Sequence, residues 1–207
     1  MEARNRPAQR ASKQRSRPQK EPEDNRPKAY ITVGPPASGK STLVRSIKKK
    51  EPNLVQAELD QSRKALNRSP AHFGKDIVRH QDEVIKGAAQ DKKPLVVSNT
   101  SIPKKHREGL SVTLQQQGYK PVPVLMPASS KAAFRRNSNR PTNAAPGEGK
   151  VPDFVMNNMI RQTKGINVRP KGGGALSRKD RREARSNYKE LHKKYRFTVP
   201  NMKRLYR

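Results

Sequence analysis

A glycine-rich loop between a short apolar run and a helical pattern constrains this chain more than any other feature. Residues 29–33 are mostly β-branched or aromatic, residues 34–41 fit the pattern G-x-x-x-x-G-K-[ST], and an amphipathic pattern begins at Lys40. A strand, a loop and a helix in this order form a P-loop, where main-chain N–H groups and the helix dipole surround a phosphate. The sequence therefore predicts an α/β fold of the P-loop NTPase type that binds a nucleotide.

The composition of the loop indicates which groups bind the phosphates. Two glycines allow the tight backbone path, and two prolines have no N–H to donate, so the donors are expected over residues 37–42. Lys40 is expected to reach the β- and γ-phosphates of ATP, and the Ser41 hydroxyl is expected to bind Mg²⁺. The nucleotide-binding residues predicted in this loop are Gly34, Ala37, Ser38, Gly39, Lys40, Ser41 and Thr42.

The overall composition permits one modest core and favours a polyanionic partner. The 207 residues are 30% hydrophobic and 4% aromatic, which suits one domain with poorly packed extensions. Lys and Arg number 47 against 17 Asp and Glu, and the net charge of +30 far exceeds what solubility needs. Nucleic acid is therefore favoured over a membrane surface. No apolar run approaches the ~20 residues of a membrane span, and no leading segment resembles a secretory signal.

The absence of Cys limits the kinds of site that the chain can build. It excludes a disulfide framework and a thiolate metal site, and it is compatible with a reducing compartment. The expected location is therefore cytoplasmic or otherwise intracellular, including the host cytoplasm for a phage-encoded chain, and a nuclear location stays open. The four histidines are too far apart for a metal-ligand motif and are interpreted as surface or packing residues: His72, His80, His106 and His192.

Charge and apolar periodicity divide the chain into three parts. Residues 1–28 have no apolar period and form a basic tail that is expected to be disordered. Residues 29–163 carry the P-loop domain, and residues 164–207 form a basic extension. For the tail, nucleic-acid tethering and a purely solubilising role are both open, and an organelle-targeting peptide is a weaker third interpretation.

Strands and helices are expected to alternate within the P-loop domain. Because helical crossovers link the strands, the sequence predicts a parallel sheet with helices on both faces. Pro123 lies within the last strand, which therefore belongs at the sheet edge. Strands are predicted at residues 29–33, 54–59, 95–99 and 122–126, and helices at residues 40–50, 76–90, 104–117, 132–137 and 152–163, with a further short helix around Arg63.

Polar residues beyond the strand ends are the candidates for chemistry. The second strand is expected to end at Asp60, and the short helix after it carries Arg63. In open α/β sheets ligands bind beyond the carboxyl ends of the strands, so both residues are expected to meet the nucleotide. At the end of the third strand, Ser98 and Asn99 stand where many P-loop enzymes have an Asp that assists Mg²⁺.

A later arginine-rich segment is a candidate lid. Arg136 and Arg140 precede a loop rich in Pro, Asn and Gly that runs to Lys150. Arginines on such a loop can close over a phosphate site and stabilise charge on the transferring phosphoryl group. Both are therefore predicted to contact the nucleotide, and Arg140 is also a candidate catalytic residue.

The C-terminal extension has a glycine-rich hinge at residues 172–174 and then one basic helical pattern with Ser177 as its N-cap. Two interpretations stay open. Aromatic residues spaced among cations suit stacking on unpaired bases, namely Tyr195, Phe197 and Tyr206. Alternatively, an apolar stripe packs the helix against the domain and leaves its charges in solvent, namely Tyr188, Leu191 and Tyr195.

Taken in order, the motifs resemble those of the polynucleotide 5′-hydroxyl kinases, the end-healing enzymes of phage and of eukaryotic DNA repair. The resemblance covers residues 29–162 and rests on GPPASGKSTL, LDQSR, VVSNTSI, FRRNSNR and VPDFVM. It implies ATP-dependent phosphorylation of the 5′-hydroxyl end of DNA or RNA, with ATP and Mg²⁺ bound at the P-loop. The implied catalytic set is Lys40, Asp60, Arg63 and Arg140.

The resemblance also implies a role for each of these side chains. The family's acid after the second strand removes the proton of the acceptor hydroxyl, which implies Asp60 as general base. Arg63 is implied to engage the acceptor's phosphate and to set that acid, and Arg136 and Arg140 are implied to contact the donor's phosphates. The residues alone leave Glu58 as a rival base, because strand alternation would place Glu58 and Asp60 on one face.

Two other classes of function remain open. The chain could be a nucleotide- and nucleic-acid-binding protein without catalysis, which the missing strand-end Asp favours. It could also be a P-loop kinase of a small metabolite, although such a substrate gives no reason for a charge of +30.

Overall fold

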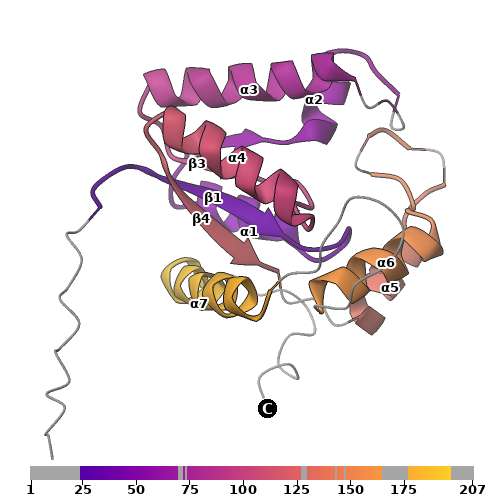
Figure 1. Cartoon of the computed structure of the whole chain (residues 1–207). Coiled ribbons are helices and arrows are strands. Elements are labelled where there is room, and N and C mark those ends of the chain that lie inside the picture. The colour runs from indigo at the N-terminus through magenta and orange to yellow at the C-terminus, as the bar shows by residue number, and fades with distance from the viewer. Residues whose placement is uncertain are drawn as a thin grey trace, which may run out of the picture.

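Four strands form one parallel sheet in the order β2-β3-β1-β4 (Figure 1). The register places Ile31 of β1 between Val97 of β3 and Pro123 of β4. The strands are β1 (Lys28–Val33), β2 (Val55–Ala57), β3 (Leu95–Val97) and β4 (Lys120–Leu125). This computed structural model describes residues 24–69, 72, 74–126, 130–142, 144–146, 148–164 and 177–196.

Helices cover both faces of the sheet, as the sequence predicted. They are α1 (Lys40–Lys48), α2 (Leu59–Ala65), α3 (Lys75–Gln90), α4 (Lys104–Gln116), α5 (Ser130–Ser138), α6 (Asp153–Thr163) and α7 (Arg178–Tyr195). Figure 1 shows α3 and α4 on one face of the sheet and α1 and α7 on the other. In the part of the chain that the structure describes, no helix is long and apolar enough to cross a membrane.

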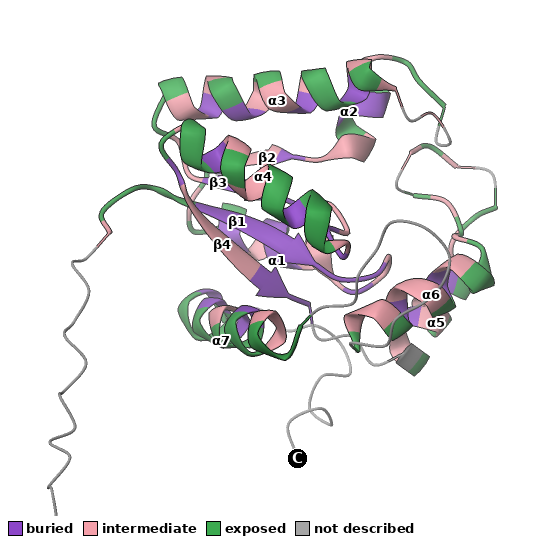
Figure 2. Ribbon diagram, in the orientation of Figure 1, coloured by how far each residue is buried: buried purple, intermediate pink, exposed green. Residues whose placement is uncertain are grey.

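Alternation along the strands builds apolar clusters on both faces of the sheet, and Figure 2 shows β1 in the colour of buried residues. Ala29 and Ile31 of β1 face α3 and α4, where they meet Ile85 and Leu114. Tyr30, between them, faces the opposite way into a cluster with residues of α1 and α7. Because successive side chains of a strand point to opposite faces, a sheet covered on both sides must be apolar at every position. This explains why residues 29–33 of β1 are buried and mostly apolar, and the buried Thr32 hydroxyl donates to the Asn99 carbonyl at 2.9 Å.

The second strand is shorter than predicted. It ends at Ala57, Glu58 is the extended N-cap residue of α2, and Leu59 and Asp60 already belong to that helix. The prediction of a strand over residues 54–59 was therefore wrong at its carboxyl end. The helix begins early because the amide oxygen of Asn99, beyond β3, accepts the Leu59 N–H at 2.9 Å. Strand alternation therefore cannot relate Glu58 to Asp60.

Strand β4 lies at the edge of the described sheet, as Pro123 indicated. The N–H groups of Lys120 and Met126 donate toward β1. Since main-chain groups alternate in direction along a strand, the main-chain nitrogens of Pro121 and Pro123 point away from β1. Prolines there cost no hydrogen bond of the ladder. The side-chain amide of Asn187, on α7, donates to the outward carbonyl of Pro123 at 2.7 Å.

Helix α7 packs against the domain through its apolar stripe. Tyr188, Leu191 and Tyr195 are buried in one cluster with Tyr30 and residues of α1. The use of Tyr195 for base stacking was therefore a wrong prediction, because only 4% of that residue is exposed. The rival prediction of packing is confirmed for this helix.

Other predictions fall on residues outside the described part of the chain. These are the tail at residues 1–23, the glycine-rich hinge at residues 172–174, and the aromatic residues Phe197 and Tyr206.

Candidate active site

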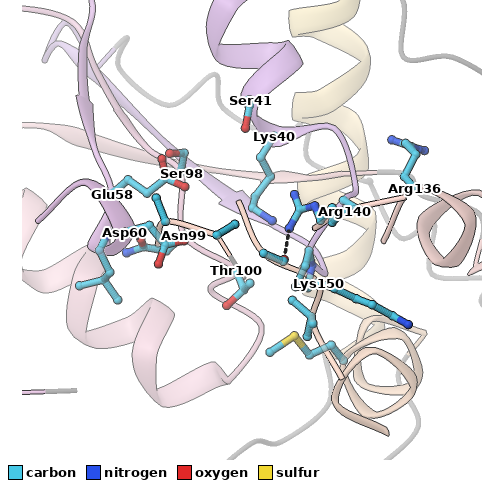
Figure 3. Close-up of a pocket in the computed structure, with 18 of the residues that line it drawn as sticks. Lys40, Ser41, Glu58, Asp60, Ser98, Asn99, Thr100, Arg136, Arg140 and Lys150 are labelled. Carbon is cyan, nitrogen blue, oxygen red and sulfur yellow. Dashed lines mark hydrogen bonds between the residues drawn. The ribbon is translucent and has the colours of Figure 1, made fainter. Parts of the chain in front are cut away.

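A cavity of about 730 Å³ lies at the carboxyl ends of the strands, between the P-loop, α2 and the segment before α6 (Figure 3). This is where ligands bind in open parallel sheets. Most of the predicted site residues meet there. Those that line the cavity are Ala37, Gly39, Lys40, Ser41, Thr42, Asp60, Arg63, Arg136 and Arg140.

The two other predicted loop residues, Gly34 and Ser38, do not line the cavity. They pack within the loop instead. The Gly34 N–H donates to the Thr100 carbonyl at 3.0 Å, and a Cβ at Gly34 would lie 2.9 Å from Cβ of Met126. Only glycine therefore fits there without a shift of the neighbouring strand end. Ser38 is fully buried, and its hydroxyl finds no hydrogen-bond partner among the described residues.

The backbone of the loop has the strained form that a phosphate cradle requires. Ala37 and Gly39 both have left-handed φ values, of 58° and 98°. No side chain caps α1, so the N–H groups of its first turn are open to a ligand in the cavity. Strained backbone with uncapped donors suits an anion. These features fit the triphosphate of ATP.

Lys40 points back onto its own loop. Its Nζ donates to the Pro35 carbonyl at 2.9 Å and to the Gly34 carbonyl at 3.4 Å. The pKa of Lys40 is lowered to about 8, chiefly by burial; Glu58 and Asp60 act to raise it, and the nearby Arg140 acts to lower it. A partly buried cation whose hydrogen-bond acceptors are neutral carbonyls gains from an added anion.

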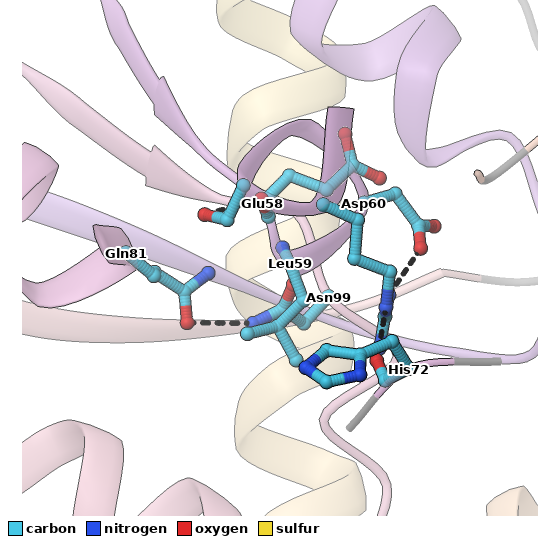
Figure 4. A network of polar contacts seen from close by, with 8 residues as sticks. Glu58, Leu59, Asp60, His72, Gln81 and Asn99 are labelled. Atoms are coloured by element: carbon cyan, nitrogen blue, oxygen red, sulfur yellow. Dashed lines mark hydrogen bonds and ion pairs between the residues drawn. The ribbon is translucent and has the colours of Figure 1, made fainter. Parts of the chain in front are cut away.

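Asp60 and Arg63 form an ion pair within α2 (Figure 4). The Arg63 side chain is only 4% exposed, and its Nε also donates to the His72 carbonyl at 2.8 Å. The Asp60 side chain is 35% exposed. Arg63 therefore fixes the Asp60 carboxylate while leaving it open to the cavity.

Glu58, which also lines the cavity, is partly buried and hydrogen-bonded. Its Oε2 accepts from the Gln56 side-chain amide at 2.8 Å, and that amide nitrogen also lies 3.0 Å from the Ser98 hydroxyl. Burial raises the pKa of Glu58, the neighbouring Asp60 raises it further, and contacts with Ser98, Lys40 and Gln56 partly offset this. Glu58 therefore holds its proton more tightly than an exposed Glu.

Asn99 supports α2, a role that the sequence did not indicate (Figure 4). Its amide oxygen accepts the Leu59 N–H at 2.9 Å, and its Nδ2 donates to Gln81 Oε1 at 3.2 Å. An Asp could accept from Leu59, but its carboxylate could not donate to Gln81. The amide at this strand end thus holds the helix that carries Asp60.

The segment between α5 and α6, residues 139–150, is here called the lid loop. Asn137 is fully buried and closes the loop at its base, because its side-chain amide donates to the Val151 carbonyl at 2.7 Å and its oxygen accepts the Val151 N–H at 3.0 Å. Arg140 lies 3.4 Å from the Gly149 carbonyl and reaches toward Lys40 in Figure 3, whereas Arg136 lies farther from Lys40.

The cavity also contains side chains that the sequence did not single out. Lys150 and Thr100 line it, and the Lys150 N–H donates to the Pro141 carbonyl at 2.8 Å. Lys150 ends the segment that was predicted as a lid and directly precedes the helix start at Val151-Pro152. This position could have identified it as a cavity residue. Nothing in the local pattern pointed to Thr100.

The residues at the cavity suit a metal that is held mainly by its substrate. Among the residues that the structure describes, no group of three or more His, Cys, Asp or Glu side chains could hold a metal ion. Mg²⁺ keeps several waters and usually takes one or two protein ligands together with substrate phosphates. The exposed Ser41 in the first turn of α1 fits such a partial site, and its role as a metal ligand stays a prediction.

Comparison with known families agrees with the fold. The family model AAA_33, described as an AAA domain, matches residues 30–165. No curated protein matched the chain.

Several solved structures are similar to this chain. A chain in the structure of a Pnkp1/Rnl/Hen1 complex has a TM-score of 0.50 and 18% identity over 56% of this chain and 42% of that one. A chain in the structure of the Pnkp1/Rnl/Hen1 RNA repair complex has a TM-score of 0.48 and 15% identity over 84% of this chain and 47% of that one. A gluconokinase from Sinorhizobium meliloti 1021 has a TM-score of 0.44 and 15% identity over 81% of this chain and 95% of that one. The protein spans less than half the length of the first two chains, and at these identities the likeness shows the fold alone.

Proposed function

Because the chain belongs to the AAA_33 family of AAA domains, with a P-loop kinase-like fold, we propose that it is an ATP-dependent kinase of the 5′-hydroxyl ends of DNA or RNA. One observation carries the proposal. Asp60, fixed by Arg63, lines the same cavity as Lys40 and the uncapped first turn of α1. A carboxylate facing a phosphate cradle is the arrangement that phosphoryl transfer to an alcohol needs.

Each side chain then has one task. The N–H groups of residues 37–42 and Lys40 hold the phosphates of ATP, and Ser41 takes one place on Mg²⁺. When bound, Mg²⁺ would neutralise negative charge on the phosphates of ATP. Asp60 accepts the proton of the acceptor hydroxyl. As it does so, the hydroxyl oxygen bonds to the γ-phosphorus, and the bond between that phosphorus and the leaving ADP breaks. Arg140 stabilises the charge that develops on the transferring group.

Charge supports a polyanionic acceptor. The cavity is lined by five cationic side chains, Lys40, Arg63, Arg136, Arg140 and Lys150, against two carboxylates, Glu58 and Asp60. The whole chain has a net charge of +30. A small neutral alcohol would gain little from such a field, whereas a nucleic-acid strand is steered and held by it.

The test is transfer of label from γ-labelled ATP to oligonucleotides. Single-stranded DNA and RNA of one sequence are offered with a 5′-hydroxyl, and matched strands with a 5′-phosphate serve as blocked controls. We expect label only on the 5′-hydroxyl strands. Absence of labelling by a protein that binds ATP would overturn the proposal.

Two further arms identify the other classes of function. Consumption of ATP with a panel of sugars and sugar acids, but with no oligonucleotide, would indicate a metabolite kinase. Tight and steeply salt-dependent oligonucleotide binding without any turnover would indicate a non-catalytic binding protein.

A further inference from the structure

Lys64 lies one helical turn beyond Asp60 on α2, so the two side chains share one face of the helix. Residues four apart on a helix have Cβ atoms about 5–6 Å from each other. The Lys64 side chain is 44% exposed and forms an ion pair with Glu148 of the lid loop. A solvent-accessible cation therefore stands next to the carboxylate that we assign to the acceptor hydroxyl.

Arg63, the neighbouring cation, is committed to other partners. It is almost completely buried, pairs with Asp60 and donates to the His72 carbonyl. The resemblance to 5′-hydroxyl kinases implied that Arg63 engages the acceptor's phosphate, but in this structure its visible contacts position Asp60. Lys64 is the more exposed of the two cations on this part of α2.

Glu148 supplies the anion that Lys64 meets in this structure. Its side chain is 59% exposed, and its N–H donates to the Ala145 carbonyl at 3.0 Å in a turn of the lid loop. The residues on either side of this turn, Ala145 and Gly149, line the cavity. The carboxylate of Glu148 is thus held against α2 where the lid loop meets it.

We propose that Lys64 binds the first phosphodiester of the acceptor strand, and that the Glu148 carboxylate takes the place of this phosphate when no acceptor is bound. A 5′-terminal hydroxyl and that phosphate are one nucleoside apart, and one turn of α2 separates the groups that would receive them. An exposed Lys–Glu pair contributes little free energy, whereas a phosphate offers stronger charge-assisted hydrogen bonds. Acceptor binding therefore exchanges one anion for another. This inference rests on the proposed 5′-kinase function.

The first experiment removes each charge in turn. The KM for a 5′-hydroxyl oligonucleotide is measured for the wild type and for Lys64→Ala, with a native first linkage or with an uncharged methylphosphonate there. We expect Lys64→Ala to raise KM about tenfold on the native strand and less than about twofold on the neutral one, with kcat nearly unchanged. Lys48→Ala, an exposed lysine at the far end of α1, is the matched control and should leave both KM values as they are. Equal effects on the two strands would overturn the contact.

The second experiment separates a phosphate contact from a mere latch on the lid loop. The double variant Lys64→Glu with Glu148→Lys restores an ion pair between α2 and the lid loop with its signs reversed. If Lys64 acts only by holding the loop, the exchange should return KM to the wild-type value, and that result would overturn the proposal. If Lys64 binds the phosphate, KM should stay raised, because a carboxylate now faces the strand. Glu148→Gln alone should lower KM, since Lys64 loses its competing anion.

A binding measurement keeps this inference distinguishable from the proposed function. Fluorescence anisotropy of a labelled 5′-hydroxyl oligonucleotide gives Kd without any need for turnover. Weaker binding by Lys64→Ala, in a protein that transfers no phosphate, would support the contact and defeat the kinase. Normal phosphate transfer by the wild type, with Kd and KM unchanged in Lys64→Ala, would support the kinase and defeat the contact.

Discussion

At the scale of single residues, Lys40 is a cation held in a cradle built for an anion. Burial lowers its pKa to about 8 from its ordinary value of 10.5. Between these two pH values the unfolded chain binds a proton that the folded chain does not, so this residue makes stability rise with pH in that window. Below about pH 8 the folded chain carries a charge that burial disfavours. A phosphate bound beside Lys40 would offset this cost.

Replacing Lys40 by Met should therefore stabilise the protein while abolishing ATP binding. We expect about 1–2 kcal/mol of extra unfolding free energy at pH 7, shrinking toward zero as the pH approaches 10. Urea denaturation of both proteins from pH 6.5 to 10 measures the difference, in which the titrations common to both chains cancel. A gain in stability that does not change over this range would contradict the buried-charge explanation.

Asp60 and Glu58 can be separated as candidate bases by amide substitution. Asp60→Asn should lower kcat for oligonucleotide phosphorylation by about 10²–10⁴-fold while leaving ADP affinity within about twofold. Glu58→Gln should cost far less, because the Glu58 carboxylate is already engaged by the Gln56 side-chain amide, whereas Asp60 is held at the cavity by Arg63. Steady-state kinetics and calorimetric titration with ADP measure both effects. The converse ranking of the two variants would identify Glu58 as the base.

At the scale of secondary structure, the base of the lid loop depends on Asn137. This side chain is fully buried and makes both of its hydrogen bonds to the main chain of Val151. Its removal leaves two partly buried main-chain groups of Val151 without these partners, and the lid loop loses the contact that sets the position of Arg140.

Asn137→Ala should destabilise the protein by about 1–3 kcal/mol and raise the KM for ATP. The loop should also become a preferred site of proteolytic cleavage, since its ends are no longer tied together. The control is Asn139→Ala, two residues on and exposed, which should change neither property. Limited proteolysis with mass spectrometry of the fragments locates the cut. Equal cleavage of the two variants would show that Asn137 does not hold the lid loop.

Elements were predictable where their signal is local. The P-loop and the helix after it depend on neighbouring residues, and α3 and α6 begin and end within one or two residues of their predicted bounds. The end of β2 was not predictable in this way. It is set by the amide of Asn99, which lies 40 residues along the chain from Leu59 and comes close only when β3 joins the sheet. Separation along the chain also hid the role of Asn99 and the pairing of Lys64 with Glu148, which are 84 residues apart.

At the scale of the whole molecule, α7 shows what composition alone leaves undecided. Its sequence is strongly basic, yet Tyr188, Leu191 and Tyr195 complete the core over α1 and β4. Periodicity identified this stripe, but only the tertiary structure provides the sheet face that it covers. The Arg107–Asp180 ion pair at 3.1 Å and the contact of Lys194 with Glu51 at 2.9 Å tie both ends of the helix to the body. The helix is thus part of the packed protein, and its outer face is free to carry charge.

The two faces of α7 should consequently fail in different ways. Leu191→Ala removes a buried side chain and should cost about 2–5 kcal/mol of stability. Replacing the exposed Arg182, Arg185 and Lys193 by Gln should change stability by less than about 0.5 kcal/mol.

If α7 contributes to the nucleic-acid surface, this triple change should also weaken oligonucleotide binding and reduce the slope of log Kd against log salt by up to about 2–3. Urea denaturation and anisotropy titrations from 50 to 300 mM salt, on the order of physiological ionic strength, measure the two effects on the same samples. An unchanged slope would place the bound strand elsewhere, and would leave the cavity cations and the residues beyond α7 as the source of the affinity.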